Sequence, residues 1–388
     1  MNSIPGAIKI KLDAYLDGAD DILYVRAPGR INLIGEHTDY NNGLVLPGAI
    51  NKHMYFAASP NGTNEINAIA IDLNESIVLD LSNLIKTNRL WADYLTGILL
   101  EFKKRNIQLS GFDCALTSQV PIGAGISSSS ALECAFLVGI KELHGLDIDN
   151  WELIKMSQSS NHNFLGIKGG ILDQFSSLFG KRDKIMLLDC DSLDYQYVTI
   201  PTNKYTWLLI NTNVQHNHLN SGYNDRVKEC GTALKDVQKT YPDVQHLSSI
   251  KNLNDLSLIH FSNPIIEKRA RYIVEENARV KSFITAIEKS QFEKCGELLY
   301  ASHKGLQENY EVSCKELDFL VDLLKDNSYV LGSRMMGGGF GGCTINLVEE
   351  STVSEITDLV STSYFEAFGI EPAFYVVEIS EGAERLRF

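Results

Sequence analysis

The chain has 388 residues, of which 44% are hydrophobic and 22% charged, and its net charge is −14 at pH 7. A single hydrophobic core stops growing near about 250–300 residues, so this length predicts a globular protein of two domains. The negative charge and the lack of Lys and Arg clusters argue against a nucleic-acid partner. Because the protein is negatively charged overall, a polyanionic ligand such as a nucleoside triphosphate needs local hydrogen-bond donors or a divalent cation in order to bind.

The seven cysteines are scattered, odd in number and without a Cys-x-x-Cys pair. This pattern predicts reduced, mostly buried thiols in a cytoplasmic protein. The first residues do not resemble a signal peptide, and no apolar run reaches the roughly 18 residues of a membrane-spanning helix. We therefore expect neither export nor membrane insertion.

The first predicted strand, residues 22–26, ends at Pro28-Gly29 and is followed by a polar loop. Four side chains give this loop its character: Arg30, Glu36, His37 and Asp39. Clustered carboxylates need hydrogen-bond donors, and the hydroxyl groups of a sugar suit acidic acceptors. The loop therefore predicts a site for a small polyol. The alternative is a surface loop in which Arg30 pairs internally with Glu36 or Asp39.

A second predicted strand, residues 112–120, runs into a glycine–serine loop, residues 121–130, and then into an apolar helix, residues 131–143. Glycines allow close approach of a phosphate, and the amino-terminal end of a helix favours an anion. The alternative is that the serines only cap the helix. The loop is not a Walker A motif, because no Gly-Lys-Ser/Thr follows the glycines.

Two further candidates are ambiguous from the residues alone. Asp173 follows Gly169-Gly170 and a predicted helix over residues 151–164, and it is either a catalytic base or the cap of the next helix. Trp91 and Tyr94 have helical spacing, which by itself favours core packing.

The second half alternates strands and helices and so predicts an α+β or α/β arrangement with a boundary near residue 180. Ser313 and Glu316 form a capping-box pattern before a helix that leads through Gly332 to a loop with five glycines in residues 337–342. That loop either approaches a ligand or is a tight helix-to-strand turn. The apolar face of the helix is Leu317, Leu320, Val321 and Leu324. The remaining predicted elements are strands over residues 185–189, 207–211, 343–348 and 374–379, and helices over 223–241 and 263–290.

In this order and spacing, the motifs closely resemble those of the GHMP kinase superfamily. Residues 29–40 are similar to the galactokinase signature, residues 121–131 to the phosphate loop of the superfamily, and residues 332–343 to its third motif. The resemblance covers essentially the whole chain. It implies a two-domain α+β fold with the active site between the domains. The amino-terminal α/β domain, of the ribosomal protein S5 domain 2-like type, would span residues 1–180 with residues 375–388 returning to it, and a ferredoxin-like domain would span residues 181–374.

The resemblance also implies an activity: a cytoplasmic, monomeric enzyme that uses ATP and Mg²⁺ to phosphorylate the C1 hydroxyl of α-D-galactose in galactose catabolism. The family's catalytic pair falls on Arg30 and Asp173. Its galactose contacts fall on Glu36, His37, Asp39, Gly170, Asp173 and Tyr223. Its ATP site falls on Trp91, Tyr94, Gly123, Gly125, Ser127, Ser128 and Ser129, and its metal ligands on Ser129 and Asn161.

The chain departs from the family at Asn161, where galactokinases usually have a glutamate before His162. Mg²⁺ prefers carboxylates, so we expect weaker metal binding. Ser130 and Gly169 replace the usual small apolar residue and cysteine. Two alternatives remain open: a kinase for N-acetylgalactosamine or another hexose, and a catalytically weakened sensor that binds galactose and ATP. Asn161 favours the sensor, whereas the full-length phosphate loop favours the enzyme.

Overall fold

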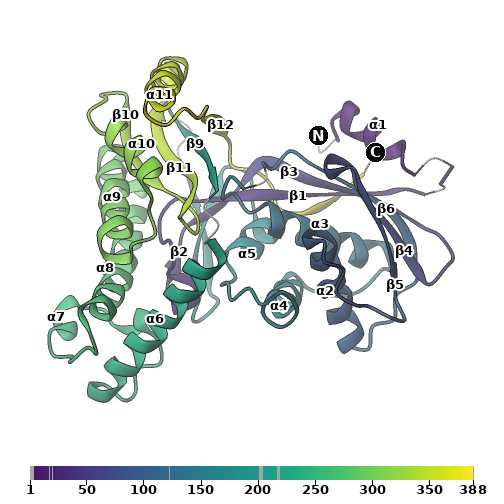
Figure 1. Ribbon diagram of the computed structural model, residues 1–388, viewed down its shortest axis with the longest axis horizontal. Coiled ribbons are helices and arrows are strands. Elements are labelled where there is room, and N and C mark those ends of the chain that lie inside the picture. Colours follow the sequence, from purple (N-terminus) through teal and green to yellow (C-terminus); the bar gives the residue numbers. More distant parts are fainter. Residues whose placement is uncertain are drawn as a thin grey trace.

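The computed structural model describes residues 4–16, 18–19, 21–121, 123–200, 204–215 and 219–387. Its two parts lie side by side, with the long strands β1 (Leu23–Asn32) and β3 (Pro47–Pro60) running between them (Figure 1). The part drawn on the right of Figure 1 is built on a six-stranded sheet, and the part on the left contains a four-stranded sheet and long helices.

The six-stranded sheet has the strand order β13-β1-β3-β6-β4-β5. Neighbouring strands are antiparallel except for β4 and β6, which are parallel. Its four remaining strands are β4 (Glu65–Ala70), β5 (Glu75–Asp80), β6 (Phe112–Ser118) and β13 (Glu384–Leu386).

Strand β1 corrects the sequence prediction, because it does not end at Pro28-Gly29 but continues to Asn32. Pro28 cannot donate to the ladder, and the pairing with β3 shifts register between Pro28 and Arg30. Gly29 allows this bulge to pack, because a Cβ there would lie 2.7 Å from the carbonyl oxygen of Ile126. Arg30 consequently lies on a strand and not in a loop.

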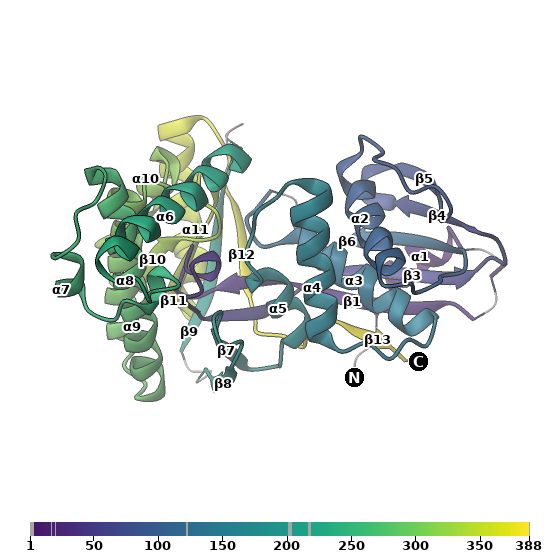
Figure 2. The ribbon, with the colours of Figure 1, turned by 90° about the horizontal axis from the view of Figure 1, so that it is seen from below.

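Alternation along the strands gives the six-stranded sheet two apolar faces. Val25 and Phe56 pack in the main core, under the helices that follow in the chain, whereas Tyr24 and Ala57 pack toward α1 (Gly6–Asp13) on the opposite face. Figures 1 and 2 show the four helices of the first face as one layer. They are α2 (Leu90–Lys104), α3 (Ser128–Leu143), α4 (Asn150–Ser160) and α5 (Leu172–Phe179).

The four-stranded sheet is antiparallel, with the order β10-β11-β9-β12. Its strands are β9 (Tyr205–Gln215), β10 (Val330–Met335), β11 (Gly341–Glu349) and β12 (Ala373–Val377). The helices of this part are α6 (Leu219–Thr240), α7 (Leu253–Leu256), α8 (Pro264–Glu288), α9 (Phe292–Gly305), α10 (Lys315–Lys325) and α11 (Val353–Phe368).

Helix α10 confirms one prediction and contradicts two. Its predicted face, Leu317, Leu320, Val321 and Leu324, is buried. The predicted capping box is wrong, because the cap position is Cys314 and the Ser313 hydroxyl donates to Asp318 instead. The helix also does not lead directly to the glycine loop. Strand β10 intervenes, so the loop joins two antiparallel strands.

Residues from both sides of position 180 share a small third sheet, β2-β7-β8, formed by β2 (Leu44–Val45), β7 (Lys184–Asp189) and β8 (Tyr195–Thr199). At the carboxyl end, β13 pairs with β1. The predicted domain boundaries stay predictions. Across the described ranges, no helix is both long and apolar enough to cross a membrane.

Candidate active site

A cavity of about 400 Å³ lies where the two parts meet. It is lined from β1, the loop after β1, the helices α2 to α6 and the loop between β10 and β11. Ten of the predicted site residues line it: Arg30, Glu36, His37, Asp39, Tyr94, Ser129, Asn161, Gly170, Asp173 and Tyr223. Segments separated by up to about 300 residues in the chain therefore contribute to a single site.

Arg30 and Asp173 form an ion pair in this cavity. Nε of Arg30 donates to Oδ1 of Asp173 at 2.8 Å, and Nη1 donates to the carbonyl oxygen of Gly125 at 2.6 Å. Arg30 is almost fully buried, whereas the side chain of Asp173 is 34% exposed to the cavity. The guanidinium thus connects the carboxylate to the phosphate loop and leaves part of that carboxylate accessible to a ligand.

Glu36 is held by three donors. Its Oε2 accepts from Nδ2 of Asn32 at 2.7 Å, and its Oε1 accepts from Nη2 of Arg334 at 3.2 Å and from the backbone N–H of Gly337 at 2.7 Å. Arg334 is fully buried and also donates to the carbonyl oxygens of Leu33 and Met335. Sequence reasoning missed Arg334, although it lies in the third motif. Arg334 fixes the loop after β1 to strand β10.

Asp39 lies directly against Gly170. A Cβ at position 170 would stand 2.0 Å from Oδ2 of Asp39, so any larger residue there would displace the Asp39 side chain. Burial raises the pKa of Asp39 to about 7, and the nearby charge of Asp173 adds to the rise. A hydrogen bond from a hydroxyl group would stabilise the ionised form of this carboxyl group.

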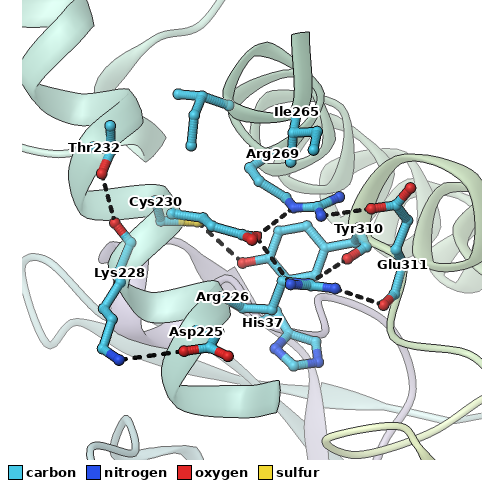
Figure 3. A network of polar contacts seen from close by, with 12 residues as sticks. His37, Asp225, Arg226, Lys228, Cys230, Thr232, Ile265, Arg269, Tyr310 and Glu311 are labelled. Atoms are coloured by element: carbon cyan, nitrogen blue, oxygen red, sulfur yellow. Dashed lines mark hydrogen bonds and ion pairs between the residues drawn. The ribbon is translucent and has the colours of Figure 1, made fainter. Parts of the chain in front are cut away.

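His37 ends a chain of polar groups that reaches into the helical part; Figure 3 draws its members His37, Tyr310 and Cys230, with the contact between the last two as a dashed line. Nδ1 of His37 lies 2.9 Å from the hydroxyl of Tyr40, which lies 2.7 Å from the hydroxyl of Tyr310. The Tyr310 hydroxyl is in turn 3.1 Å from Sγ of Cys230. Burial lowers the pKa of His37 to about 3, so the ring is neutral at pH 7. Nε2 of His37 is buried and has no well-aligned hydrogen-bond partner among the described residues.

Two arginines fix this chain of polar groups from behind. Nε of Arg226 donates to the carbonyl oxygen of Tyr310 at 2.6 Å, and Nε of Arg269 donates to Oε2 of Glu229 at 2.7 Å. Figure 3 shows both guanidinium groups beside the Tyr310 ring. The predicted sugar contact Tyr223, on α6, has its ring centroid 5.4 Å from that of His37, with the two rings tilted by 37°. Helix α6 thus closes the cavity beside His37.

The glycine–serine loop and the glycine loop touch each other. Gly125 and Ser127 both have positive φ (72° and 63°), and α3 begins at Ser128 with its amino-terminal end at the cavity. A Cβ at Gly337 would lie 3.1 Å from the carbonyl oxygen of Gly125. Gly123 and Ser127 lie on this loop, although neither lines the cavity described above.

A second cavity, of about 520 Å³, adjoins the first through Tyr94 and Ser129, which line both. Trp91 and Ser128 also line it. Trp91 Nε1 donates to Oε2 of Glu75 at 2.6 Å, and both Trp91 and Tyr94 are largely buried in the core, so packing and cavity lining apply together. This second cavity lies between α2 and the start of α3.

Asn161 lies in the π-helical turn Asn161–Leu165 that extends α4. Its Nδ2 donates to Oε2 of Glu133 at 3.2 Å, and Nε2 of Gln174 is 3.4 Å from the same oxygen. Burial raises the pKa of Glu133 to about 7. No group of three or more His, Cys, Asp and Glu side chains in the described ranges could hold a metal ion. Sequence reasoning missed Glu133, whose position one helical turn after Ser129 was the available signal.

Comparison with known proteins identifies the family. Residues 14–60 match the galactokinase galactose-binding signature, residues 93–181 the GHMP kinase amino-terminal domain, and residues 283–366 the GHMP kinase carboxyl-terminal domain. The chain is 40% identical to the galactokinase of Thermosipho africanus, over 94% of this chain and 99% of that protein. The chain belongs to the galactokinase family. It is therefore a kinase, and the predicted GHMP kinase fold is confirmed.

Other galactokinases agree. The Thermotoga maritima enzyme is 38% identical over 93% of this chain and 99% of that protein. The crystal structure of Lactococcus lactis galactokinase complexed with galactose superposes with a TM-score of 0.93 at 34% identity, covering 98% of this chain and 99% of that one. Methanococcus jannaschii mevalonate kinase, at a TM-score of 0.63 and 18% identity over 94% of this chain and 100% of that one, shares the fold.

Proposed function

We propose that this galactokinase transfers the terminal phosphoryl group of ATP to the C1 hydroxyl of α-D-galactose, giving galactose 1-phosphate and ADP. The observation that carries the proposal is the Arg30–Asp173 ion pair at 2.8 Å, between the phosphate loop and the residues of the galactokinase signature. It brings a proton acceptor, a fixed cation and a sugar site into a single cavity.

In the proposed reaction, Asp173 accepts the proton of the C1 hydroxyl as that oxygen attacks phosphorus. Arg30 keeps the carboxylate ionised and offsets the charge that develops on the transferred group. Because Arg30 also donates to the carbonyl oxygen of Gly125, the pair keeps its position relative to the phosphate loop. Phosphoryl transfer asks a protein mainly for alignment and electrostatic stabilisation, and rigid positioning of this kind supplies both.

The sugar is held by acceptors and by a neutral histidine. Glu36 and Asp39 accept hydrogen bonds from hydroxyl groups of the sugar, and Nε2 of His37 forms a hydrogen bond with a further hydroxyl group. Each oxygen of Glu36 already accepts one or two bonds from the protein, so its orientation is set before the sugar arrives. Gly170 leaves room for Asp39, and the ring of Tyr223 covers the sugar.

ATP is proposed to lie with its adenine in the cavity of Trp91 and Tyr94 and its phosphates at the start of α3, on the loop of Gly123, Gly125, Ser127, Ser128 and Ser129. Free N–H groups and the positive end of a helix favour phosphate there. Ser129 and Asn161 both line the cavity that contains Arg30 and Asp173, and they would hold Mg²⁺. The residues fit the ion, because the buried Oδ1 of Asn161 lacks a donor and hard cations prefer oxygen ligands. When bound, Mg²⁺ would neutralise phosphate charge.

The direct test is to incubate the protein with MgATP and each of D-galactose, N-acetylgalactosamine and D-glucose, and to identify products by ³¹P NMR. We expect galactose 1-phosphate from galactose and little product from glucose, because a site built to pair a particular hydroxyl rejects analogues by about 10⁴-fold. Equal turnover of glucose would refute the assignment. Galactose binding without any product would instead identify a sensor.

We also propose that the protein acts as a cytoplasmic monomer. All seven cysteines are free, and six of them are buried, as expected of a reducing compartment. Light scattering coupled to gel filtration tests the monomer: a mass near 43.2 kDa is expected, and twice that mass would contradict it.

A further inference from the structure

A group of buried side-chain oxygens lies beside the proposed cation site, on the three linked residues Glu133, Asn161 and Gln174. Three of these oxygens have no hydrogen-bond donor in the structure, and they come from α3, the π-helical turn and α5: Oε1 of Glu133, Oδ1 of Asn161 and Oε1 of Gln174. Buried polar atoms are nearly always paired in native proteins, so an unpaired group of this kind requires an explanation. All three are oxygens, which are the atoms that a hard cation or its water ligands would satisfy.

Glu133 is the only one of the three residues in this oxygen group with a carboxylate. It is fully buried and lies one helical turn after Ser129 on α3. Asn161 lines the cavity, whereas Glu133 does not, so Glu133 lies behind Asn161. The hydrogen bond from Nδ2 of Asn161 to Glu133 at 3.2 Å orients the planar amide and leaves Oδ1 free of Glu133.

We infer that Glu133 is a positioning residue for the divalent cation that accompanies ATP. Its carboxylate holds Asn161 so that Oδ1 faces the cation. The same carboxylate also supplies the negative charge that Asn161 lacks, from a position one hydrogen bond farther from the cation. The inference rests on the proposed function, since it assumes that the nucleotide binds at Ser129. The expectation of weaker metal binding, drawn from the sequence, changes accordingly. The negative charge that other galactokinases usually carry at position 161 is supplied in this chain by Glu133, which compensates for the neutral Asn161.

The physical basis is the influence of outer partners on a metal ligand. A carboxylate hydrogen-bonded to a ligand fixes its orientation and makes its donor atom more electron-rich, and removal of such a partner typically costs about 10- to 100-fold in metal affinity. Because the carboxylate of Glu133 is buried, its attraction for a cation at Asn161 is only weakly screened by salt.

The test compares nucleotide affinity with and without metal. Calorimetry would measure the Kd of a non-hydrolysable ATP analogue in the presence of Mn²⁺ and in the presence of EDTA, for the native protein and for Glu133→Gln. Glutamine keeps the size of the side chain and can still accept from Asn161. We expect the enhancement of affinity by Mn²⁺ to fall about 10-fold in Glu133→Gln, with the affinity in EDTA unchanged.

Glu142→Gln is the matched control, because it removes the same charge from a more exposed position on the same helix, and its enhancement by Mn²⁺ should be native. An undiminished enhancement in folded Glu133→Gln would overturn the inference. So would an equal loss in Mn²⁺ and in EDTA, because Glu133 would then be merely structural.

A rescue experiment makes the inference sharper. Adding Asn161→Glu to Glu133→Gln returns the carboxylate to the position of the family glutamate, with a glutamine behind it that can donate. The double variant should recover most of the enhancement by Mn²⁺, and a failure to recover would contradict the displaced charge. These readouts involve no turnover. A native protein that shows the enhancement but never phosphorylates galactose would defeat the proposed function without touching this inference.

Discussion

Substitution of Gly170 by alanine tests how closely the sugar site is built. The added Cβ would lie 2.0 Å from Oδ2 of Asp39 and 2.4 Å from Cγ, which is far inside contact distance. Since the obstructing atoms are the end of a side chain, Asp39 would rotate away from its position and the backbone would stay in place. The protein should still fold, but the carboxylate of Asp39 should no longer reach the sugar.

The expected cost follows from that lost bond. A hydrogen bond to a charged group contributes about 1.5–3 kcal/mol, so the Kd for galactose should rise about 10- to 100-fold. Calorimetric titration of galactose measures this change directly. The melting temperature should shift by only a few degrees, because about 1 kcal/mol corresponds to roughly 2–4 °C in a protein of this size or somewhat smaller.

Gly169→Ala is the matched control. A Cβ at Gly169 would meet no heavy atom within 4 Å, and neither glycine has a positive φ. The Kd for galactose should therefore be native in Gly169→Ala. Native affinity in Gly170→Ala as well would refute the proposal that Asp39, held against Gly170, binds the sugar.

Three further predictions concern other parts of the molecule. Burial and the charge of Asp173 raise the pKa of Asp39 to about 7, so galactose affinity measured by calorimetry should fall as the pH drops from 8 to 6, and Asp39→Asn should remove that dependence; affinity that rises at low pH would contradict it. Tyr310→Phe removes a buried hydroxyl from the chain that orients His37, and should cost about 1–2 kcal/mol in urea unfolding and raise the Kd for galactose, whereas unchanged values would show the chain to be idle. Leu320→Ala should cost about 2–5 kcal/mol of unfolding free energy because Leu320 is fully buried, against less than about 0.5 kcal/mol for the exposed Asp322→Ala on the same helix.

Sequence patterns predicted the elements whose apolar periodicity is strong. The face of α10 repeats apolar residues at helical spacing, and its burial is confirmed. The longest strand, β3, was missed, because it is buried along most of its length and so lacks the alternation that marks a half-exposed strand. The predicted end of β1 was wrong, because the strand continues past Pro28 through a bulge, whereas a proline usually ends a strand.

The candidate site divides in the same way. Motif residues such as Arg30 and Asp173 could be named in advance because the motifs around them resemble those of a known family; from the residues alone, Asp173 could equally have been a helix cap. Their partners could not. Arg334 reaches Glu36 across about 300 residues, and Glu133 is a charged residue buried within an otherwise apolar helix. No local rule pairs such groups, because only the packing of the two parts brings them together.

The most direct test of the account is Asp173→Asn. Asparagine keeps the shape of the side chain but cannot accept the C1 proton, and general-base help is typically worth about 10²- to 10⁴-fold. Single-turnover kinetics with saturating MgATP should show a loss of that size, while calorimetry shows galactose binding at close to native affinity. If the variant keeps more than half of the native rate, Asp173 is not the base and the proposed mechanism is wrong.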